Sequence, residues 1–296
     1  MFSLSGFCLC VLGVLCGEYT VKPDRSLVLK IGGELLEDPA HLTGVVGAVA
    51  RMAAAGSPIV IVHGGGKEID AALKVAGLEK RQVDGLRITD DATLDVVVSV
   101  LAGVVNTRLV AALNTGGVAA VGLTGADGAC GLSTAAPPHQ AVDGRLVDLG
   151  RVGAPDADAD TRVLHTLTAG GFVPVIASIG MGRDGRLFNV NADTFAGHLA
   201  ARLGARRLVI AGTTPGVLDA DGATLPTLAA DAVAGLVGNG TATAGMIAKL
   251  RACEHALAAG VDDVVIVDGR QLSALEAAAT SGRPSAATKL VRMVPA

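Results

Sequence analysis

The chain has 296 residues, of which half are apolar and 18% are charged, so it can form a large buried core and is not intrinsically disordered. A net charge of −4 without a basic block, with one Tyr and no Trp, argues against nucleic acid and anionic membranes as partners. We expect a globular body whose anion-binding groups are local.

The first 25 residues are expected to lie outside the fold, as an extension that is either not native or an oligomerising arm. They are hydrophobic, but they have no Lys or Arg before the apolar run, no small-residue cleavage site and too short an apolar stretch for a spanning helix. A signal peptide is the alternative. Cys130 and Cys253 stand apart from the cysteines of this segment, and no pair repeats the spacing of a zinc site. We therefore expect a reduced, cytoplasmic chain without a metal site built from protein ligands.

From residue 26 onward, short apolar runs alternate with longer stretches of helical length. Runs of this kind suit strands that are buried on both faces of a sheet. The strand candidates are SLVLKI from Ser26, PIVIVH from Pro58, VAAVGL from Val118, FVPVIAS from Phe172, RLVIAG from Arg207 and DVVIVDG from Asp263. Helical stretches include residues 39–55, 90–113 and 194–203, while residues 129–160 indicate hairpins or loops. The alternation predicts a three-layer α/β/α sandwich around a mainly parallel central sheet.

Two of these strands run directly into glycines. The first is followed by Gly32 and Gly33, and the second by Gly64, Gly65 and Gly66. Ligands of open parallel sheets bind beyond the carboxyl ends of the strands, and glycine there lets backbone N–H groups approach an oxyanion without interference from a Cβ atom. The two clusters therefore indicate phosphate binding, although glycines can also serve only as tight turns.

Lys30 lies inside an otherwise apolar strand, two residues before the first glycine cluster. A lysine in a buried strand is costly unless it meets a negative partner, so Lys30 predicts a phosphate or a carboxylate at the strand end. The alternative is an edge strand from which the ammonium group reaches solvent. Neither glycine cluster matches the P-loop or the protein-kinase pattern, so a different phosphate binder is needed.

The segment FNVNAD opens a predicted helix and offers Asn189, Asn191 and Asp193. Asn and Asp are favoured helix caps, but capping does not require all three side chains. Lys249 lies in the helical stretch AGMIAKL, where an exposed lysine would be ordinary. The histidines have no mutual spacing that suggests a metal site, and we expect structural roles for them, including His63 at the end of the second strand.

Taken in order, several segments resemble the acetylglutamate kinases of the amino acid kinase family. They are LVLKIGGE, IVHGGGKEID, VDGLRITD, VGLTGADG, FVPVIASIG, FNVNADTFAGHLA, TTPGVLD and GMIAKL. The resemblance runs from about residue 27 to residue 268. Each segment alone is weakly specific, whereas the ordered set is highly specific. VDGLR followed by NVNAD resembles the acetylglutamate branch rather than the aspartate, glutamate, carbamate or uridylate kinases.

The resemblance implies the amino acid kinase fold over residues 26–296, with an amino-acid lobe at about 26–180 and an ATP lobe at about 181–296. It implies phosphorylation of the side-chain carboxylate of N-acetyl-L-glutamate by ATP, an early step of arginine biosynthesis. Mg²⁺ would be held mainly by the nucleotide phosphates. A homodimer or a larger homo-oligomer is expected.

The resemblance also implies roles for individual residues. Lys30 would bind the transferring phosphoryl group and Lys249 the nucleotide phosphates, with Asp193 holding both lysines in position. Arg87 and Asn189 would bind the α-carboxylate and neighbouring atoms of the amino acid. The other implied contacts are Gly65 and Gly66 for the amino acid, Gly32, Gly33, Gly64 and Gly65 for phosphate, and Thr213, Gly216 and Lys249 for the nucleotide.

The sequence departs from the family pattern in two places, and two alternatives stay open. Thr213 stands where many members carry an aspartate near the adenine, and SAATKLV from Ser285 lacks the glycines of arginine-inhibited relatives, so a feedback-regulated hexamer is not expected. A same-fold kinase for an aminoadipate derivative is one alternative, although such relatives tend to lose a glycine that this HGGG turn keeps. A catalytically silent, ligand-binding regulator is the other, and the retained Lys30, Asp193 and Lys249 argue against it.

Overall fold

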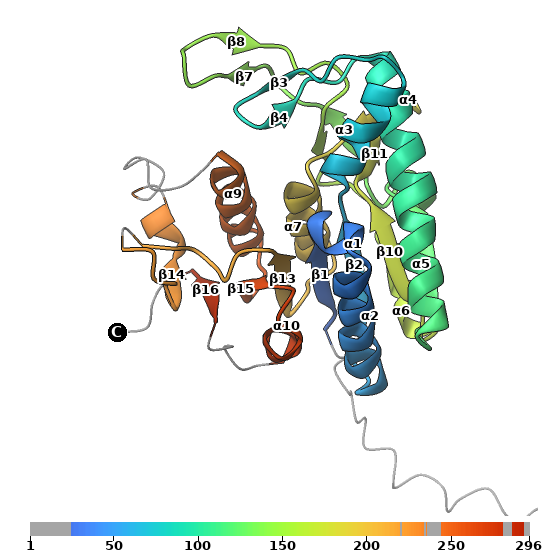
Figure 1. The fold of residues 1–296 in the computed structure, drawn as a ribbon, viewed down its shortest axis with the longest axis vertical. Coiled ribbons are helices and arrows are strands. Elements are labelled where there is room, and N and C mark those ends of the chain that lie inside the picture. Colours follow the sequence, from blue (N-terminus) through green and yellow to red (C-terminus); the bar gives the residue numbers. More distant parts are fainter. Residues whose placement is uncertain (1–24, 220, 234, 236–243, 281–285, 293–296) are drawn as a thin grey trace, which may run out of the picture.

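The computed structural model describes residues 25–219, 221–233, 235, 244–280 and 286–292. Residues 1–24 of the expected extension, and Ser285 of the last segment, lie outside the described residues. The central sheet has eight strands in the spatial order β14-β16-β15-β13-β1-β2-β10-β5 (Figure 1). In that order the strands are Thr227–Ala229, Ala287–Val291, Asp263–Asp268, Arg207–Gly212, Leu27–Ile31, Ile59–His63, Val173–Ala177 and Ala120–Thr124.

The pairing in this sheet confirms the predicted parallel arrangement. Each neighbouring pair is parallel except β15 with β16, which is antiparallel. The sheet is continuous across residue 180, so both predicted lobes share it. The division into an amino-acid lobe and an ATP lobe stays a prediction.

Helices cover both faces of the sheet. Because side chains alternate along a strand, β1 sends Leu27, Leu29 and Ile31 into one core and Val28 into the other. The first core also takes side chains from α1 Glu34–Glu37, α2 Pro39–Ala54, α3 Gly66–Val75, α4 Asp91–Val98, α5 Asn106–Thr115 and α10 Leu272–Ala279. The second takes them from α6 Arg162–Ala169, α7 Ala192–Arg202 and α9 Ala244–Ala258. These two cores, one on each face, confirm the three-layer α/β/α sandwich.

Residues 91–115 form one continuous helix with an unusual centre. Between α4 and α5, residues Ser99–Val105 are π-helical. By length and composition alone, this is the one helix among the described residues that is apolar enough to cross a membrane. Core helices of soluble proteins pass the same test, and Val97, Leu101 and Leu109 of this helix are buried in the first core.

Small antiparallel hairpins lie off the central sheet. They are β3 Gln82–Val83 with β4 Leu86–Arg87, β6 Ser133–Ala135 with β9 Gly153–Pro155, β7 His139–Gln140 with β8 Leu146–Val147, and β11 Ile179–Met181 with β12 Leu187–Asn189. Short 3₁₀ turns occupy Asp127–Ala129 and Ala230–Ala232. The hairpins within residues 129–160 are those expected there. At the top of Figure 1, β3, β4, β7 and β8 gather beyond the sheet.

Candidate active site

Three neighbouring parallel strands end at the same edge of the sheet. Ile31, the last residue of β1, pairs with His63 of β2 on one side and with Ala211 of β13 on the other. The glycines that follow β1 and β2 therefore meet beyond this edge. A Cβ atom built on Gly33 would lie 3.1 Å from the Cα atom of Gly65, so the two glycine turns face each other too closely for side chains between them.

The second glycine turn leads into helix α3, which begins at Gly66. The first N–H groups of a helix have no intrahelical acceptor, and the helix dipole adds a partial positive charge at this end. A Cβ atom on Gly66 would meet nothing within 4 Å, so the space next to this helix end is open. The turn and the start of helix α3 thus have the geometry that suits an anion, and phosphate binding there stays a prediction.

Lys30, Asp193 and Lys249 form a buried charge cluster close to these turns. The Lys30 Nζ atom lies 2.9 Å from Asp193 Oδ1, and the Lys249 Nζ atom lies 3.8 Å from Asp193 Oδ2. All three side chains are buried: the exposed fraction is 10% for Lys30, 11% for Asp193 and 15% for Lys249. Three residues from β1, α7 and α9 are thus brought together, as the resemblance implied.

Electrostatics within this cluster keep the carboxylate charged. Burial alone would raise the pKa of the Asp193 carboxyl, but the two lysines outweigh burial, so its pKa lies below the ordinary value. Burial lowers the pKa of Lys249, and Lys30 lowers it further, while Asp193 opposes this shift. One carboxylate thus serves two ammonium groups, and an additional anion would stabilise both.

The three polar side chains of FNVNAD make different contacts. Asn191 is the N-cap of α7, and its Oδ1 atom accepts hydrogen bonds from the N–H groups of Asp193 and Thr194, both at 3.0 Å. The Asp193 carboxylate is therefore not needed as a helix cap and can pair with Lys30 and Lys249. Asn189, at the end of β12, donates through Nδ2 to Thr89 Oγ1 at 3.1 Å and lines the neighbouring cavity. Capping explains only one of the three side chains.

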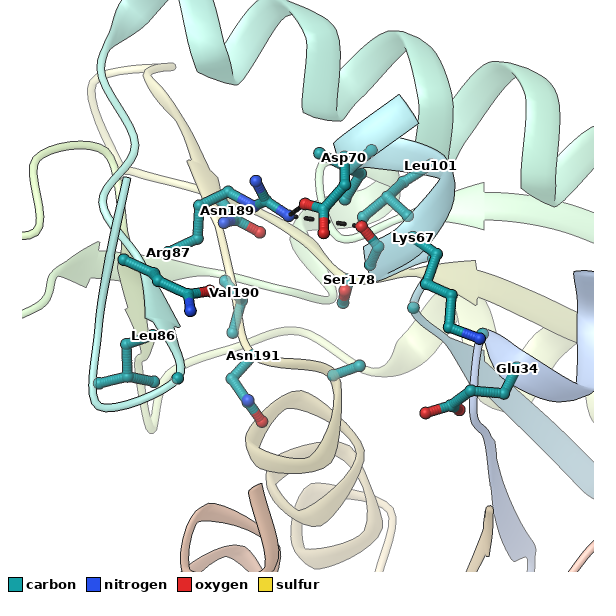
Figure 2. A pocket seen from close by; sticks show the side chains of 18 of the residues that line it. Glu34, Lys67, Asp70, Leu86, Arg87, Leu101, Ser178, Asn189, Val190 and Asn191 are labelled. Carbon is teal, nitrogen blue, oxygen red and sulfur yellow. Dashed lines mark hydrogen bonds and ion pairs between the residues drawn. The ribbon is translucent and has the colours of Figure 1, made fainter. Parts of the chain in front are cut away.

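A cavity of about 430 Å³ lies next to the glycine turns (Figure 2). Its lining includes the predicted residues Lys30, Gly33, Gly64, Gly65, Gly66, Arg87 and Asn189. Arg87 forms an ion pair with Asp70 through Nη2, which also lies 3.4 Å from the Gly66 carbonyl oxygen. Its Nη1 atom is buried and has no hydrogen-bond partner among the residues that the structure describes. Arg87 thus lines a cavity that could bind a carboxylate, and it carries a buried donor that no described residue satisfies.

Sequence reasoning missed several charged groups that line this cavity, although three of them lie within quoted motifs: Glu34, Lys67 and Asp70. Asp70 and Lys67 belong to IVHGGGKEID. Asp70 binds Arg87 through Oδ1 and Lys80 through Oδ2, the latter at 2.8 Å, while Lys67 binds Glu37 at 3.2 Å. Burial opposes the shift, yet Lys80 and Arg87 hold the pKa of Asp70 below its ordinary value.

Five predicted residues lie outside the lining of this cavity: Asp193 and Lys249 of the charge cluster, and Gly32, Thr213 and Gly216. Gly32 follows β1, and its N–H donates to the Ala211 carbonyl at 2.8 Å. Thr213 follows β13, and its carbonyl accepts from Arg270 Nη2 at 2.9 Å. Gly216 has φ +134°, and a Cβ atom on it would lie 2.4 Å from Thr288 Oγ1. Gly216 thus has a structural reason to be glycine, and the nucleotide-binding roles of Thr213 and Gly216 stay predictions.

Comparison with known proteins agrees with this geometry. The sequence profile of the amino acid kinase family matches residues 25–268. An acetylglutamate kinase of Novosphingobium aromaticivorans is 42% identical over 255 residues, which cover 83% of this chain and 84% of that protein. A second acetylglutamate kinase, from Granulibacter bethesdensis, is 42% identical over 253 residues, with the same coverage of both chains.

Among solved structures, N-acetylglutamate synthase from Neisseria gonorrhoeae, complexed with coenzyme A and N-acetyl-glutamate, is 25% identical with a TM-score of 0.77. The match covers 92% of this chain but only 60% of the synthase. Family profile, curated relatives and the arrangement of the charged cluster agree. The chain therefore belongs to the amino acid kinase family and, within it, to the acetylglutamate kinases.

Proposed function

We propose that this chain transfers the γ-phosphoryl group of ATP to the γ-carboxylate of N-acetyl-L-glutamate, which gives N-acetylglutamyl 5-phosphate and ADP. The reaction is an early step of arginine biosynthesis, and we place it in the cytoplasm. The observation that carries the proposal is the buried Lys30–Asp193–Lys249 cluster beside a cavity that Arg87 and Asn189 line. The acetylglutamate kinase relatives support the choice of acceptor.

The chemistry needs alignment rather than a general base. A side-chain carboxylate is already ionised at neutral pH, so one of its oxygens can attack the γ-phosphorus directly. The bond between that phosphorus and the β,γ-bridging oxygen breaks, the electron pair leaves with ADP, and no proton is transferred. Charge then develops on the transferring group, where the Lys30 ammonium group and the amides of the facing glycine turns would stabilise it.

The amino acid would be held by groups on the other side of the cavity. The guanidinium group of Arg87, which lines the cavity, suits the α-carboxylate, because it forms strong, directional hydrogen bonds with carboxylates. Asn189, which Thr89 orients, would bind neighbouring polar atoms. Together they would hold the γ-carboxylate near the glycine turns. Only an acceptor of the right length would then place its side-chain carboxylate in line with the phosphoryl group.

ATP would approach from the side of α9, with Lys249 binding its phosphates and Thr213 and Gly216 near the rest of the nucleotide. Within the described ranges, no group of three or more His, Cys, Asp or Glu side chains could hold a metal ion, and both Asp193 oxygens face lysines. The nucleotide phosphates would therefore hold Mg²⁺, which neutralises phosphate charge when bound. A homodimer or larger homo-oligomer is part of this proposal, and sedimentation analysis would test it.

Trapping the acyl phosphate with hydroxylamine tests the reaction. The purified chain is given ATP and Mg²⁺ with N-acetylglutamate, glutamate, aspartate or N-acetyl-aminoadipate in parallel. We expect hydroxamate mainly with N-acetylglutamate. A dominant product from N-acetyl-aminoadipate would overturn the proposed acceptor, and no hydroxamate with any acceptor would overturn the enzyme activity.

A further inference from the structure

A pair of buried polar side chains lies directly behind the second glycine turn. His63, the last residue of β2, is fully buried, and its Nδ1 atom lies 3.1 Å from the Gly64 carbonyl oxygen. Its Nε2 atom lies 2.9 Å from Asn106 Nδ2. Asn106 is 5% exposed, and the same Nδ2 atom lies 2.9 Å from the Val175 carbonyl oxygen in β10. Neither side chain lines the cavity.

These contacts determine which nitrogen of His63 carries the proton. A carbonyl oxygen only accepts, so Asn106 must present its NH₂ group, and not its oxygen, to Val175. The second hydrogen of this NH₂ group then reaches His63 Nε2, which must be an acceptor. The proton therefore lies on Nδ1 and is donated to the Gly64 carbonyl. Burial, which lowers the pKa of His63 to about 4, keeps the ring in this neutral form.

The hydrogen bond to Gly64 orients the next amide group of the turn. In a planar trans peptide the C=O and N–H groups point in opposite directions. Because the Gly64 carbonyl points toward the His63 ring, the N–H group of Gly65 points away from it. The Gly65 nitrogen lies 3.4 Å from the position of a Cβ atom built on Gly33, so this amide group borders the space between the two glycine turns.

The surrounding chain is shaped to hold Asn106 in place. Asn106 directly follows the π-helical segment Ser99–Val105, and such wide turns shift the face on which later helix residues lie. A Cβ atom on Gly122 of β5 would lie 2.2 Å from Asn106 Oδ1, so glycine leaves the space for this side chain. Leu101 and Val105 of the π segment lie 3.0 and 3.1 Å from a Cβ atom built on Gly65.

We propose that His63 and Asn106 are positioning residues for phosphoryl transfer, which lock the Gly64–Gly65 peptide so that the Gly65 N–H faces the transferring group. This inference rests on the proposed kinase function. Neither side chain touches a substrate. Their effect passes through the Gly65 amide, so it should appear in kcat, because binding of the amino acid by Arg87 does not depend on them.

Variants of His63 test the role of the Nδ1 donor. His63→Leu removes it and should lower kcat about 100-fold, as expected for a misplaced donor, with KM for N-acetylglutamate nearly unchanged. His63→Asn places an amide NH₂ group where Nδ1 was, and should restore kcat to within about tenfold of the wild type. Equal losses in the two variants, or a folded His63→Leu with normal kcat, would overturn the proposal.

Variants of α5 separate positioning from packing. Asn106→Ala should lower kcat and allow a proton on His63 Nε2. Asn114 is the matched control, because it lies on the same helix and its Nδ2 atom also bonds a sheet carbonyl, that of Ala120, at 3.0 Å. Asn114→Ala should lower thermal stability but leave kcat unchanged. An equal loss of kcat in both variants would refute the positioning role of Asn106 and show that it contributes only to packing.

Nitrogen-15 NMR of histidine-labelled protein reads the tautomer without any assay of activity. The chain has six histidines, and the His63 signals are those that vanish in His63→Asn. We expect a protonated Nδ1 and an unprotonated Nε2 at neutral pH in the wild type. An Nε2–H ring in an active enzyme would overturn this inference alone, whereas a wild type that forms no acyl phosphate would overturn the proposed function and this inference with it.

Discussion

Replacing Asp193 by Asn removes the one carboxylate that two buried ammonium groups share. The Asp193 oxygens lie 2.9 Å from Lys30 Nζ and 3.8 Å from Lys249 Nζ. Unit charges at about 4 Å attract by about 4 kcal/mol at an effective dielectric constant of about 20. Removing one partner of a buried pair costs about 3–5 kcal/mol, because the remaining charge is left uncompensated. We expect Asp193→Asn to lower the free energy of unfolding by about that amount.

The same substitution should change turnover and its dependence on pH. Both lysines lose the group that holds them, and displacements of about 1 Å cost about 100-fold in rate, so kcat should fall by at least that factor. Lys249 acts as a cation, so activity is lost as rising pH removes its proton. Because Asp193 raises the pKa of Lys249, its removal should move the alkaline limb of the kcat profile to lower pH.

Urea unfolding and hydroxamate formation from neutral to alkaline pH measure these effects. Asp158→Asn is a matched control, because Asp158 pairs with Arg183 at 2.6 Å while its side chain is 75% exposed. Exposed pairs contribute only about 0–1 kcal/mol, so this variant should behave almost as the wild type. If Asp193→Asn unfolds like Asp158→Asn and keeps the alkaline limb of the wild type, the reasoning about the shared carboxylate is wrong.

Three further substitutions probe other parts of the site. Lys30→Ala should lower kcat about 100- to 1000-fold in the hydroxamate assay, as for other lost oxyanion donors, and near-normal turnover would refute the role of Lys30. Arg87→Lys should raise KM for N-acetylglutamate about 10- to 100-fold, because about 1.5–3 kcal/mol of charged hydrogen bonding is lost. KM for ATP should stay unchanged, and equal changes in both constants would contradict the assignment. Gly216→Ala, at φ +134°, should lower the free energy of unfolding by about 1–3 kcal/mol, and unchanged urea unfolding would show that the Thr288 contact relaxes without cost.

Apolar patterning was sufficient to predict the centre of the fold. β1, β2 and β10 are buried along their whole length, and apart from Lys30 and His63 their residues are apolar, so these runs stand out in the sequence. The strands β14 and β16 were not predicted. β14 has three residues, and β16 contains Lys289, whose ammonium group pairs with Asp263 at 2.9 Å, so neither has an apolar run long enough to indicate a strand.

The centre of the long helix was equally beyond sequence reasoning. Residues 90–113 were predicted to be helical, and the structure has a continuous helix over 91–115. A π-helical segment changes the hydrogen-bond spacing without changing the apolar character of SVLAGVV, so periodicity does not separate it from an α-helix. This is why Asn106 was missed, although its position depends on that segment.

The charged residues of the site follow one arrangement that explains both what was predicted and what was missed. Asp193 lies between Lys30 and Lys249, and Asp70 lies between Arg87 and Lys80. The first cluster was found because its members belong to motifs that resemble the family. In the second cluster Arg87 was predicted, Asp70 was missed although it lies within a quoted motif, and Lys80 was missed because it lies outside the quoted segments.

In both clusters one carboxylate serves two cations. A buried cation without full compensation is costly, and Arg87 bears part of this cost, because its Nη1 atom has no hydrogen-bond partner within the described part of the chain. Each cluster therefore has a place for one further negative charge. In the proposed reaction, the amino-acid carboxylate fills the place beside Arg87, and the phosphoryl group fills the place beside Lys30 and Lys249. The two anions repel each other in solution. Two such places next to the facing glycine turns would hold them close enough together to react.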